Sequence, residues 1–523
     1  MRRSSGRRET RGKAGRPWSA NIHALPLDIA RVLIGGVLFV YFLNALRQSR
    51  DFSDPDGLID HRLVARLLPP TRISLFQPGM PGVFFRAVHL CACAASLLVI
   101  AGYHPRTAAA FLFLAAVSTL RWNVLASYLD DAMMHVFCLW LVLLPVGDTL
   151  TLPGILEHGW STATADWLKT TVPGLTPRVF LANMALVYLV AGLYKFTSPM
   201  WRDGSAMHAA LRMPIARAPD FWTLRWRTPL RLVTWAALVM EPLFALIFVL
   251  PTGSPLKWPL VAGAVVFHLG IAFTLKIPYS NAAMAGALPL ALGPEIMQVG
   301  LGLPPPQGTA ASAFAPSEIV ALTLVALIVI TLVWEAANTG RRLRERYSAK
   351  GWDNPVRALL WTVGIFQSYR LFDWVDARNY HLRFEVRRIA PGRPASRGPE
   401  PEPPDAAPAY PGAEPTAADR SAGRRLDPDA MFPRTMRHLL LQSYLVGNIW
   451  LRMSPDKLDA VRRSLLERHA RRYARMHPEA GTVDVVAVVQ RVTADNLELT
   501  RGVRRPLMRF TCRGGDAVMH SQG

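Results

Sequence analysis

Residues 178–204 read RVFLANMALVYLVAGLYKFTSPMWRDG, a long apolar run that ends in one lysine, Lys195, and is followed by Trp201 and a turn. A helix needs about 20 mostly apolar residues to cross a bilayer, and residues 178–197 meet that length. Tryptophan is enriched where such helices leave the membrane. The stretch therefore predicts a membrane-spanning helix that carries a charge about one turn inside its boundary.

The same length criterion finds eight more candidate spans, so the predicted fold class is an all-α polytopic membrane helical bundle of about nine spans. The additional spans cover residues 27–46, 83–102, 107–121, 131–147, 229–251, 257–275, 278–301 and 316–337. The short runs 107–121 and 131–147 are either tilted spans or partly re-entrant segments. A tenth run, 356–372, contains arginines and a glutamine, which is typical of an interfacial amphipathic helix.

The composition of the whole chain favours a membrane protein. Of its 523 residues, 51% are hydrophobic and only 18% are charged. The net charge of +22 comes almost entirely from arginine, clustered at the N-terminus, between the predicted helices and after residue 338. Such placement is typical of segments beside anionic lipid headgroups, so membrane lipids are the expected partners and nucleic acid is not.

The cysteines indicate neither a disulfide framework nor a zinc site. Cys91, Cys93 and Cys138 lie in apolar runs, and Cys512 stands alone near the C-terminus. Their spacing matches neither kind of site, so no metal is expected.

Changes in composition divide the chain into five parts. A basic tail (1–24) precedes the membrane domain (25–340). A basic juxtamembrane or amphipathic segment (341–388), a linker rich in proline and alanine (389–427) and a small soluble α+β domain (428–514) follow.

Two further segments contain recognisable elements. Apolar residues dispersed through the polar segment 51–82 predict a helix or loop lying on the membrane surface. A helix is expected from Ser454 to about Met476, and strands over 483–490 and within 497–512. The arginines of this helix either face water or contact phosphate groups; they are Arg462, Arg463, Arg468, Arg471, Arg472 and Arg475.

The ends of the predicted bundle give conflicting signals on orientation. Residues 1–16 are basic and lack a signal-peptide cleavage motif, which predicts a cytoplasmic N-terminus in the cell membrane. Nine spans would then place the chain after residue 338 outside the cell. The basic cluster at 341–350 indicates the cytoplasmic side instead.

Ionisable side chains inside the predicted spans are candidate functional residues, because a charge inside a bilayer is costly. They are Arg31, His89, Asp130, Asp131, His135, Lys195, Glu241 and His268. Lys195 either extends its ammonium to the lipid headgroups or, where it is desolvated, provides a neutral amine that acts as a base.

Several of these residues have more than one interpretation. His268 lies deep in an apolar run, where a neutral imidazole either bonds to a helix backbone or transfers protons. His135 follows Asp131 by four residues, so both lie on one helix face and the aspartate can fix one imidazole tautomer. Arg31 and Glu241 are candidates for a structural buried ion pair.

Residues 187–207, VYLVAGLYKFTSPMWRDGSAM, resemble the signature of the horizontally transferred transmembrane (HTTM) domain family, which includes the vitamin K-dependent gamma-carboxylase. The matching pattern consists of Ala191-Gly192, Lys195, Trp201 and Gly204. Weaker agreements that occur in the family's order are Arg31, His135, Asp148 and His268. The resemblance covers residues 25–340.

The resemblance implies an intramembrane acid–base site. In the carboxylase the matching lysine deprotonates vitamin K hydroquinone, which implies Lys195 as a catalytic base and a reduced quinone as the cofactor. It also implies that His268 assists at the substrate or orients the quinone, with His135 nearby. The candidate cofactor-binding residues are Arg31 and Trp201.

The chain departs from the carboxylase at two places. The carboxylase has two adjacent lysines, whereas this chain has Tyr194 before Lys195. Its C-terminal part does not resemble the lumenal domain of the carboxylase. Both departures weigh against gamma-carboxyglutamate formation.

Two functions from different classes follow. The first is a membrane enzyme that holds a quinone or similar lipid-like ligand in a cavity lined by Lys195, His135 and His268. The second is a non-catalytic scaffold or small-ligand transporter, in which Lys195 anchors an acidic headgroup and the C-terminal domain binds a protein partner. Convergence of the three side chains on one cavity would favour the enzyme.

Overall fold

The computed structural model describes residues 20–67, 74–212, 215–218, 221–306, 314–342, 356, 359–360, 378–388, 435–446, 455–476, 483–495, 498–513 and 516–520. The predicted tail before residue 20, the linker 389–427 and nearly all of the predicted interfacial helix 356–372 lie outside these ranges.

Six helices in the described part of the chain are long and apolar enough to cross a membrane. They are α1 (Ala24–Arg47), α4 (Gly82–Ala101), α9 (Leu175–Lys195), α12 (Arg227–Leu243), α13 (Lys257–Thr274) and α16 (Pro316–Arg342). Short 3₁₀ turns extend the apolar stretch of α12 to Leu224–Phe248. The predicted helical bundle is thus confirmed, with six helices that meet the requirement among the described residues, where nine were expected.

The other three predicted spans form helices that are more polar, shorter or broken. α5 (Pro105–Trp122) carries an arginine near each end, and α6 (Leu129–Leu143) has only 15 residues. The expected span 278–301 is divided into α14 (Pro278–Gly286), α15 (Leu288–Ala291) and a π-helical turn. Prolines in this region lack the N–H that a continuous helix needs, which explains the breaks. All three segments nevertheless pack inside the bundle.

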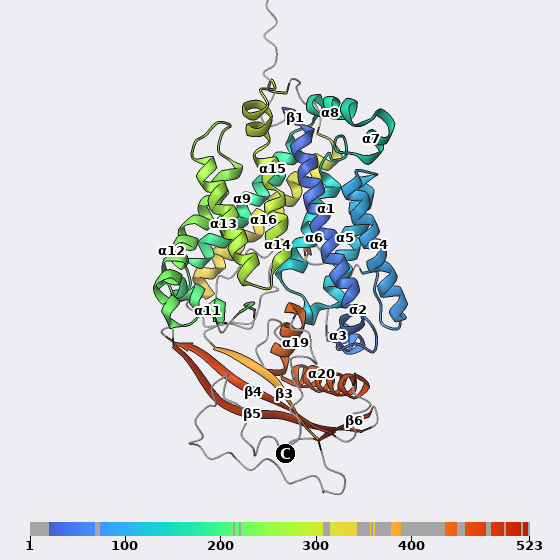
Figure 1. The fold of residues 1–523 in the computed structure, drawn as a ribbon, viewed down its shortest axis with the longest axis vertical. Helices are drawn as coiled ribbons and strands as arrows, with labels where there is room; N and C mark the ends of the chain where they lie inside the picture. Colours follow the sequence, from blue (N-terminus) through green and yellow to red (C-terminus); the bar gives the residue numbers. More distant parts are fainter. Residues whose placement is uncertain are drawn as a thin grey trace, which may run out of the picture.

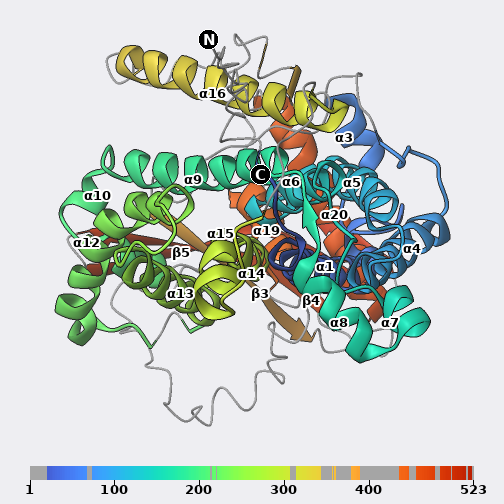
Figure 2. The ribbon, with the colours of Figure 1, turned by 90° about the horizontal axis from the view of Figure 1, so that it is seen from above.

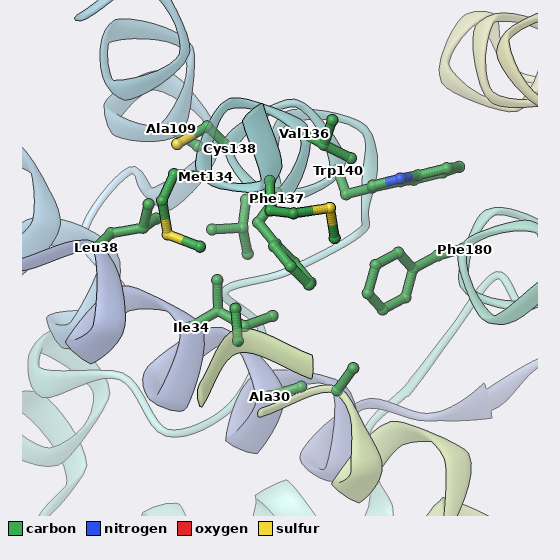
Figure 3. Close-up of a cluster of buried hydrophobic side chains, with 14 of the residues drawn as sticks. Ala30, Ile34, Leu38, Ala109, Met134, Val136, Phe137, Cys138, Trp140 and Phe180 are labelled. Atoms are coloured by element: carbon green, nitrogen blue, oxygen red, sulfur yellow. The ribbon is translucent and has the colours of Figure 1, made fainter. Parts of the chain in front are cut away.

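The helices form a bundle in which α1 packs between α4 and α14 (Figures 1 and 2). α12 and α13 lie on the far side of α14, and α16 runs along α9 at the edge of the bundle (Figure 2). Apolar side chains of α1, α5, α6 and α9 fill the core shown in Figure 3, including the buried Ile34, Leu38, Met134, Phe137 and Phe180. This close packing holds the polar groups described below in fixed positions.

A two-stranded antiparallel sheet joins the beginnings of α1 and α9. β1 (Ile22–His23) pairs with β2 (Thr171–Val172), so both helices start at the same end of the bundle. α7 (Leu152–His158) and α8 (Trp160–Lys169) also lie at this end, at the top of Figure 1. The short helices at the opposite end are α2 (Ser49–Phe52), α3 (His61–Leu67), α10 (Pro199–Arg202) and α11 (Ala206–Arg212).

The C-terminal elements lie beneath this second end (Figure 1). They are α19 (Met436–Val446), α20 (Pro455–Met476) and a four-stranded antiparallel sheet in the order β3 (Arg378–Arg388), β4 (Val483–Asp495), β5 (Glu498–Arg513) and β6 (Asp516–His520). The helix to Met476 and the strand starting at Val483 were expected. β3 was not, since it comes from the segment 341–388, for which an amphipathic structure was predicted.

The arginines of α20 correct one expectation. Arg468 donates to the carbonyls of Pro55 and Gly57 at 2.7 and 2.9 Å, and Arg472 pairs with Asp51. These two arginines therefore bind α2 and the loop after it, although each side chain remains partly exposed. Arg463, Arg471 and Arg475 are exposed, in keeping with the expected water-facing position. Arginine suits such a surface because its fork of N–H groups can reach several carbonyls at once.

An apolar contact completes this docking. Leu441 of α19 and Leu465 of α20 are buried with Phe52, Ile59 and Leu125 at the end of the bundle. The beginning of the segment 51–82 is thus covered by the C-terminal helices.

Candidate intramembrane site

Lys195 is the last residue of α9 and forms a buried ion pair with Glu241 of α12. The ammonium lies 2.8 and 2.7 Å from the two carboxylate oxygens, and the two side chains are only 4% and 5% exposed. The Trp201 ring lies 5.3 Å from the ammonium. Lys195 is therefore enclosed by protein and does not extend to the surface.

A close approach of α9 and α12 makes this pair possible. A Cβ atom at Gly192 would lie 2.4 Å from Cδ of Pro242, a distance at which atoms cannot coexist. Because Gly192 has no side chain, α9 can pack directly on the residue that follows Glu241. The glycine of the Ala191-Gly192 motif thus determines how near the lysine comes to the carboxylate.

The segment after Lys195 folds back on α12 and packs beside the ion pair. Trp201 and Ala206 lie in one apolar cluster with Ala237 and Leu238. Gly204 permits the turn, since its φ is +83° and a Cβ there would lie 2.4 Å from a side-chain carbon of Arg231. Trp201 and Gly204 of the motif therefore hold the return segment in place.

A second polar group lies two turns up the same face of α9. The Tyr188 hydroxyl is 2.5 Å from Nε2 of His268 in α13, and Nδ1 of that ring is 2.9 Å from Oδ1 of Asn281 in α14. The Asn281 amide donates to the carbonyl of Ile277 at 2.7 Å. Residues seven apart share one face of a helix, so Tyr188 and Lys195 line the same side of α9.

These bonds determine where the protons lie. Because the amide nitrogen of Asn281 faces a carbonyl, its Oδ1 faces His268 and can only accept. Nδ1 of a neutral His268 must then carry the proton, and Nε2 accepts from Tyr188. The hydrogen bonds thus run in one direction, from Tyr188 through His268 to Asn281.

Aromatic rings surround this group. Phe244 and Phe248 lie 5.7 Å from the Tyr188 ring, and Phe267 lies 5.4 Å from His268. In an apolar, aromatic setting a hydroxyl and an imidazole interact strongly with one another and with a polar ligand.

His135 belongs to a different part of the bundle. Its ring lies in α6, with Nδ1 at 3.3 Å from the carbonyl of Asp131 and an edge contact to Phe113 of α5. The Asp131 carboxylate, which was expected to orient this ring, instead accepts from Tyr41 at 2.7 Å. The structure therefore places His268 of α13 against Tyr188, on the face of α9 that carries Lys195, and places His135 with α5 and α6.

Arg31 also departs from its expected partner. Its guanidinium donates to Asp28 at 2.7 Å and to backbone carbonyls at the end of α4 and in the loop after α6; the acceptors are Val99, Ile100, Thr149 and Leu150. Glu241 pairs with Lys195 instead. Arg31 is thus a structural residue that joins three segments, and the expected Arg31–Glu241 pair is wrong.

Sequence reasoning missed Tyr188 and Asn281, and it did not pair Lys195 with Glu241. The seven-residue spacing between Tyr188 and Lys195 could have identified Tyr188, because it matches two helical turns. A second buried pair was missed too: Lys257 lies 2.8 Å from Glu295 at the start of the π-helical turn. The break in 278–301 brings Glu295 to Lys257, and the prolines that cause the break do not indicate which residue Glu295 meets.

No protein-family model, curated protein or solved structure matches the chain.

Proposed function

We propose that this chain is a multi-pass membrane protein of the HTTM type with an acid–base site for a quinol-like or lipid-like ligand. The observation that carries the proposal is the buried Lys195–Glu241 pair, with Tyr188 and His268 along the same face of α9. Three shorter segments, α5, α6 and α14–α15, would cross the membrane together with the six long helices.

A buried lysine–glutamate pair is expensive to maintain and rarely improves stability over an apolar pair. Ionisable groups that persist within membrane helices commonly serve proton transfer or ligand binding. The Lys195–Glu241 pair holds a transferable proton between an amine and a carboxylate. A weak acid that enters from the bilayer could give its proton to this pair without either group meeting water.

The residues fit a reduced quinone in chemical character. Phe244, Phe248 and Phe267 offer aromatic surface. Because the Tyr188 proton is directed at His268, the Tyr188 oxygen is left to accept a hydrogen bond from a quinol hydroxyl. A quinol would supply redox chemistry when bound. The chain would bind and orient it, and the Glu241 carboxylate, paired with the Lys195 ammonium, would accept its proton.

A lipid-soluble ligand can reach this region from the bilayer. The outer faces of α12 and α13 expose large apolar side chains, which suit contact with acyl chains. These side chains include Leu232, Trp235, Val239, Val266, Leu269 and Phe273.

The test is quinone binding by the full chain in lipid nanodiscs. A short-chain naphthoquinone, oxidised and reduced, would be titrated against the wild type, Lys195→Met and Glu241→Gln. Lys257→Met is the matched control, because it breaks the other buried lysine–glutamate pair. We expect both site variants to weaken binding of the reduced form about tenfold or more, as for loss of a charge-assisted hydrogen bond, and the control to bind normally.

Equal affinity in all four proteins would overturn the quinone proposal. That result would favour the non-catalytic scaffold or transporter.

We also propose that the end of the bundle that carries the C-terminal elements faces the cytoplasm. Basic residues at this end, near the helix termini, include Arg47, Arg50, Arg62, Arg86, Arg121, Arg202, Arg212, Arg225, Arg227, Arg231 and Lys276. The described loops at the opposite end carry far fewer, among them Arg106, Lys169 and Arg178. By the positive-inside rule this asymmetry outweighs the basic residues 1–16, and the N-terminus would lie outside.

A further inference from the structure

Asp130 of α6 provides the N-terminal cap of a helix far away in the sequence. Its buried carboxylate accepts from the backbone N–H groups of Tyr279 and Ser280 at 3.2 and 2.9 Å, and from the Ser280 hydroxyl at 2.5 Å. These are first-turn groups of α14, whose own N-cap residue, Ile277, contributes no side-chain bond. A carboxylate at this position satisfies free N–H groups and favourably meets the helix dipole.

The capped turn contains the residue that orients His268. Asn281 follows Ser280 directly and accepts from Nδ1 of His268 at 2.9 Å. If the first turn of α14 loosened, the Asn281 amide would lose its bond to Ile277 and could present either its oxygen or its nitrogen to the ring. His268 would then no longer be confined to the tautomer that accepts from Tyr188.

The neighbouring carboxylate, Asp131, is held by the C-terminal part of the chain. Arg437 of α19 pairs with it, and the Arg437 side chain is only 8% exposed. Asp131 also accepts from Tyr41 at 2.7 Å and from the backbone N–H of Tyr128 at 3.0 Å. The guanidinium lies 5.9 Å from the Tyr128 ring.

The two carboxylates are coupled because they are adjacent and fully buried. Each repels the other, so each needs compensation: Asp130 from the N-terminus of α14, and Asp131 from Arg437. Without the guanidinium, a proton would have to bind or the first turn of α6 would have to move. A proton on Asp130, or movement of that turn, weakens the cap on α14.

We propose that Asp130 is a positioning residue for His268 and that docking of α19 through Arg437 controls it. The proposal rests on the proposed function in assigning His268 to a ligand site. Docked, α19 keeps α14 capped and His268 in one tautomer. Undocked, α19 releases Asp131, and the site loses its ordered hydrogen bonds. The C-terminal region thereby regulates the intramembrane site through Arg437, Asp131 and Asp130.

Two measurements on the full chain in nanodiscs test this. Hydrogen–deuterium exchange follows peptides covering residues 277–283, and nitrogen NMR of labelled histidine follows the tautomer of His268. The variants are Asp130→Asn, Arg437→Gln and Arg437→Lys. Arg462→Gln is the matched control, since this arginine lies on α20 and pairs with Asp459 on the same helix.

We expect Asp130→Asn and Arg437→Gln to speed exchange in the first turn of α14 about tenfold, as for loss of a buried charged cap. The His268 signals should change from one tautomer to a mixture. Arg437→Lys retains the charge and should restore most of the protection, whereas Arg462→Gln should match the wild type.

Faster exchange confined to α19 and α20, with unchanged α14 and His268 signals, would show that Arg437 only attaches the C-terminal helices and would overturn the proposal. If Arg437→Gln failed to fold, exchange would rise throughout α1 and α4, and Asp130→Asn and Arg437→Lys would decide the question. Neither readout uses a quinone. The quinone proposal and this one can therefore fail independently.

Discussion

Single side chains in this bundle are stabilised in pairs. Lys195 and Glu241 compensate each other, as do Lys257 and Glu295. A buried charge that loses its partner pays the full desolvation cost, whereas removal of both charges leaves only a packing change. The two members of a pair should therefore behave as a unit.

For the Lys195–Glu241 pair, we predict that Lys195→Met or Glu241→Gln alone lowers the free energy of unfolding by about 3–5 kcal/mol. The double variant should lose clearly less than the sum of the two single losses. Thermal unfolding in detergent, followed with a thiol-reactive dye, measures the difference. Additive losses would mean that the two residues do not interact.

For Arg31, we predict that Arg31→Lys lowers stability by about 3 kcal/mol or more, because lysine cannot replace a guanidinium that reaches five acceptors. Quinone affinity measured on the remaining folded protein should not change. A selective loss of affinity with normal stability would instead assign Arg31 to ligand binding.

At this scale the sequence identified the charged residues but not their partners. Lys195, Glu241 and His268 stood out because charge and apolar surroundings conflict, which is a local property. Pairing depends on which helices meet, and that is decided by contacts such as Gly192 on Pro242. The wrong Arg31–Glu241 pair and the unexpected role of Tyr188 have this common cause.

Among the elements, the docked helices α19 and α20 should respond to pH. Burial lowers the pKa of His469 to about 4, although the bond to the Leu465 carbonyl acts in the opposite direction. The charged or titratable groups that face His469 are His438, Arg472 and Asp51. Burial alone would raise the pKa of Asp51, but bonds from His438 and Arg472 outweigh it and lower that pKa.

His469 stabilises the docked helices only where its imidazole is neutral in both the docked and the released state. A His469 released from its buried position binds a proton below about pH 6.5, whereas the docked residue resists until about pH 4. Its contribution is therefore complete above pH 6.5 and lost between about pH 6.5 and 4. Asp51 acts in the same sense, but only at still lower pH.

We predict that acidification from pH 7 to 4.5 weakens docking by on the order of 3 kcal/mol. Limited proteolysis within α19 and α20 as a function of pH measures this. His469→Gln should remove most of the change above pH 4.5. An unaltered profile in that variant would show that another group is responsible.

Local sequence patterns predicted these elements unevenly. The long apolar helices and α20 were foreseen because periodicity and capping residues are local. The expected span 278–301 failed because the run is mostly apolar and long enough to cross a membrane, whereas Pro289 and Pro294 divide it into shorter pieces. β3 was missed because its strand pairing with β4 spans about 100 residues of sequence.

For the whole molecule, α1 begins at one end of the bundle and the C-terminal elements lie at the other (Figure 1). From the sequence, residues 1–16 predicted a cytoplasmic N-terminus and nine spans placed the chain after residue 338 outside, whereas the basic cluster at 341–350 indicated the cytoplasm. The proposed orientation depends instead on arginines that the fold brings together at one end of the bundle. Most of these arginines lie far apart in the sequence.

We predict that a green fluorescent protein fused after Gly523 fluoresces in cells, because this end faces the cytoplasm. A periplasmic alkaline phosphatase fused at the same position should stay inactive. The reversed pair of results would place the C-terminal elements outside and restore the cytoplasmic N-terminus expected from residues 1–16.

The contact between Gly192 and Pro242 also has an evolutionary consequence. A methyl group at residue 192 would push the two helices apart and separate the amine from the carboxylate that lie beside this contact. A larger residue in α9 can therefore survive only with a compensating change in α12. Among homologous chains, residues 192 and 242 should accordingly vary as a pair. Such covariation would indicate that selection has maintained the distance between Lys195 and Glu241.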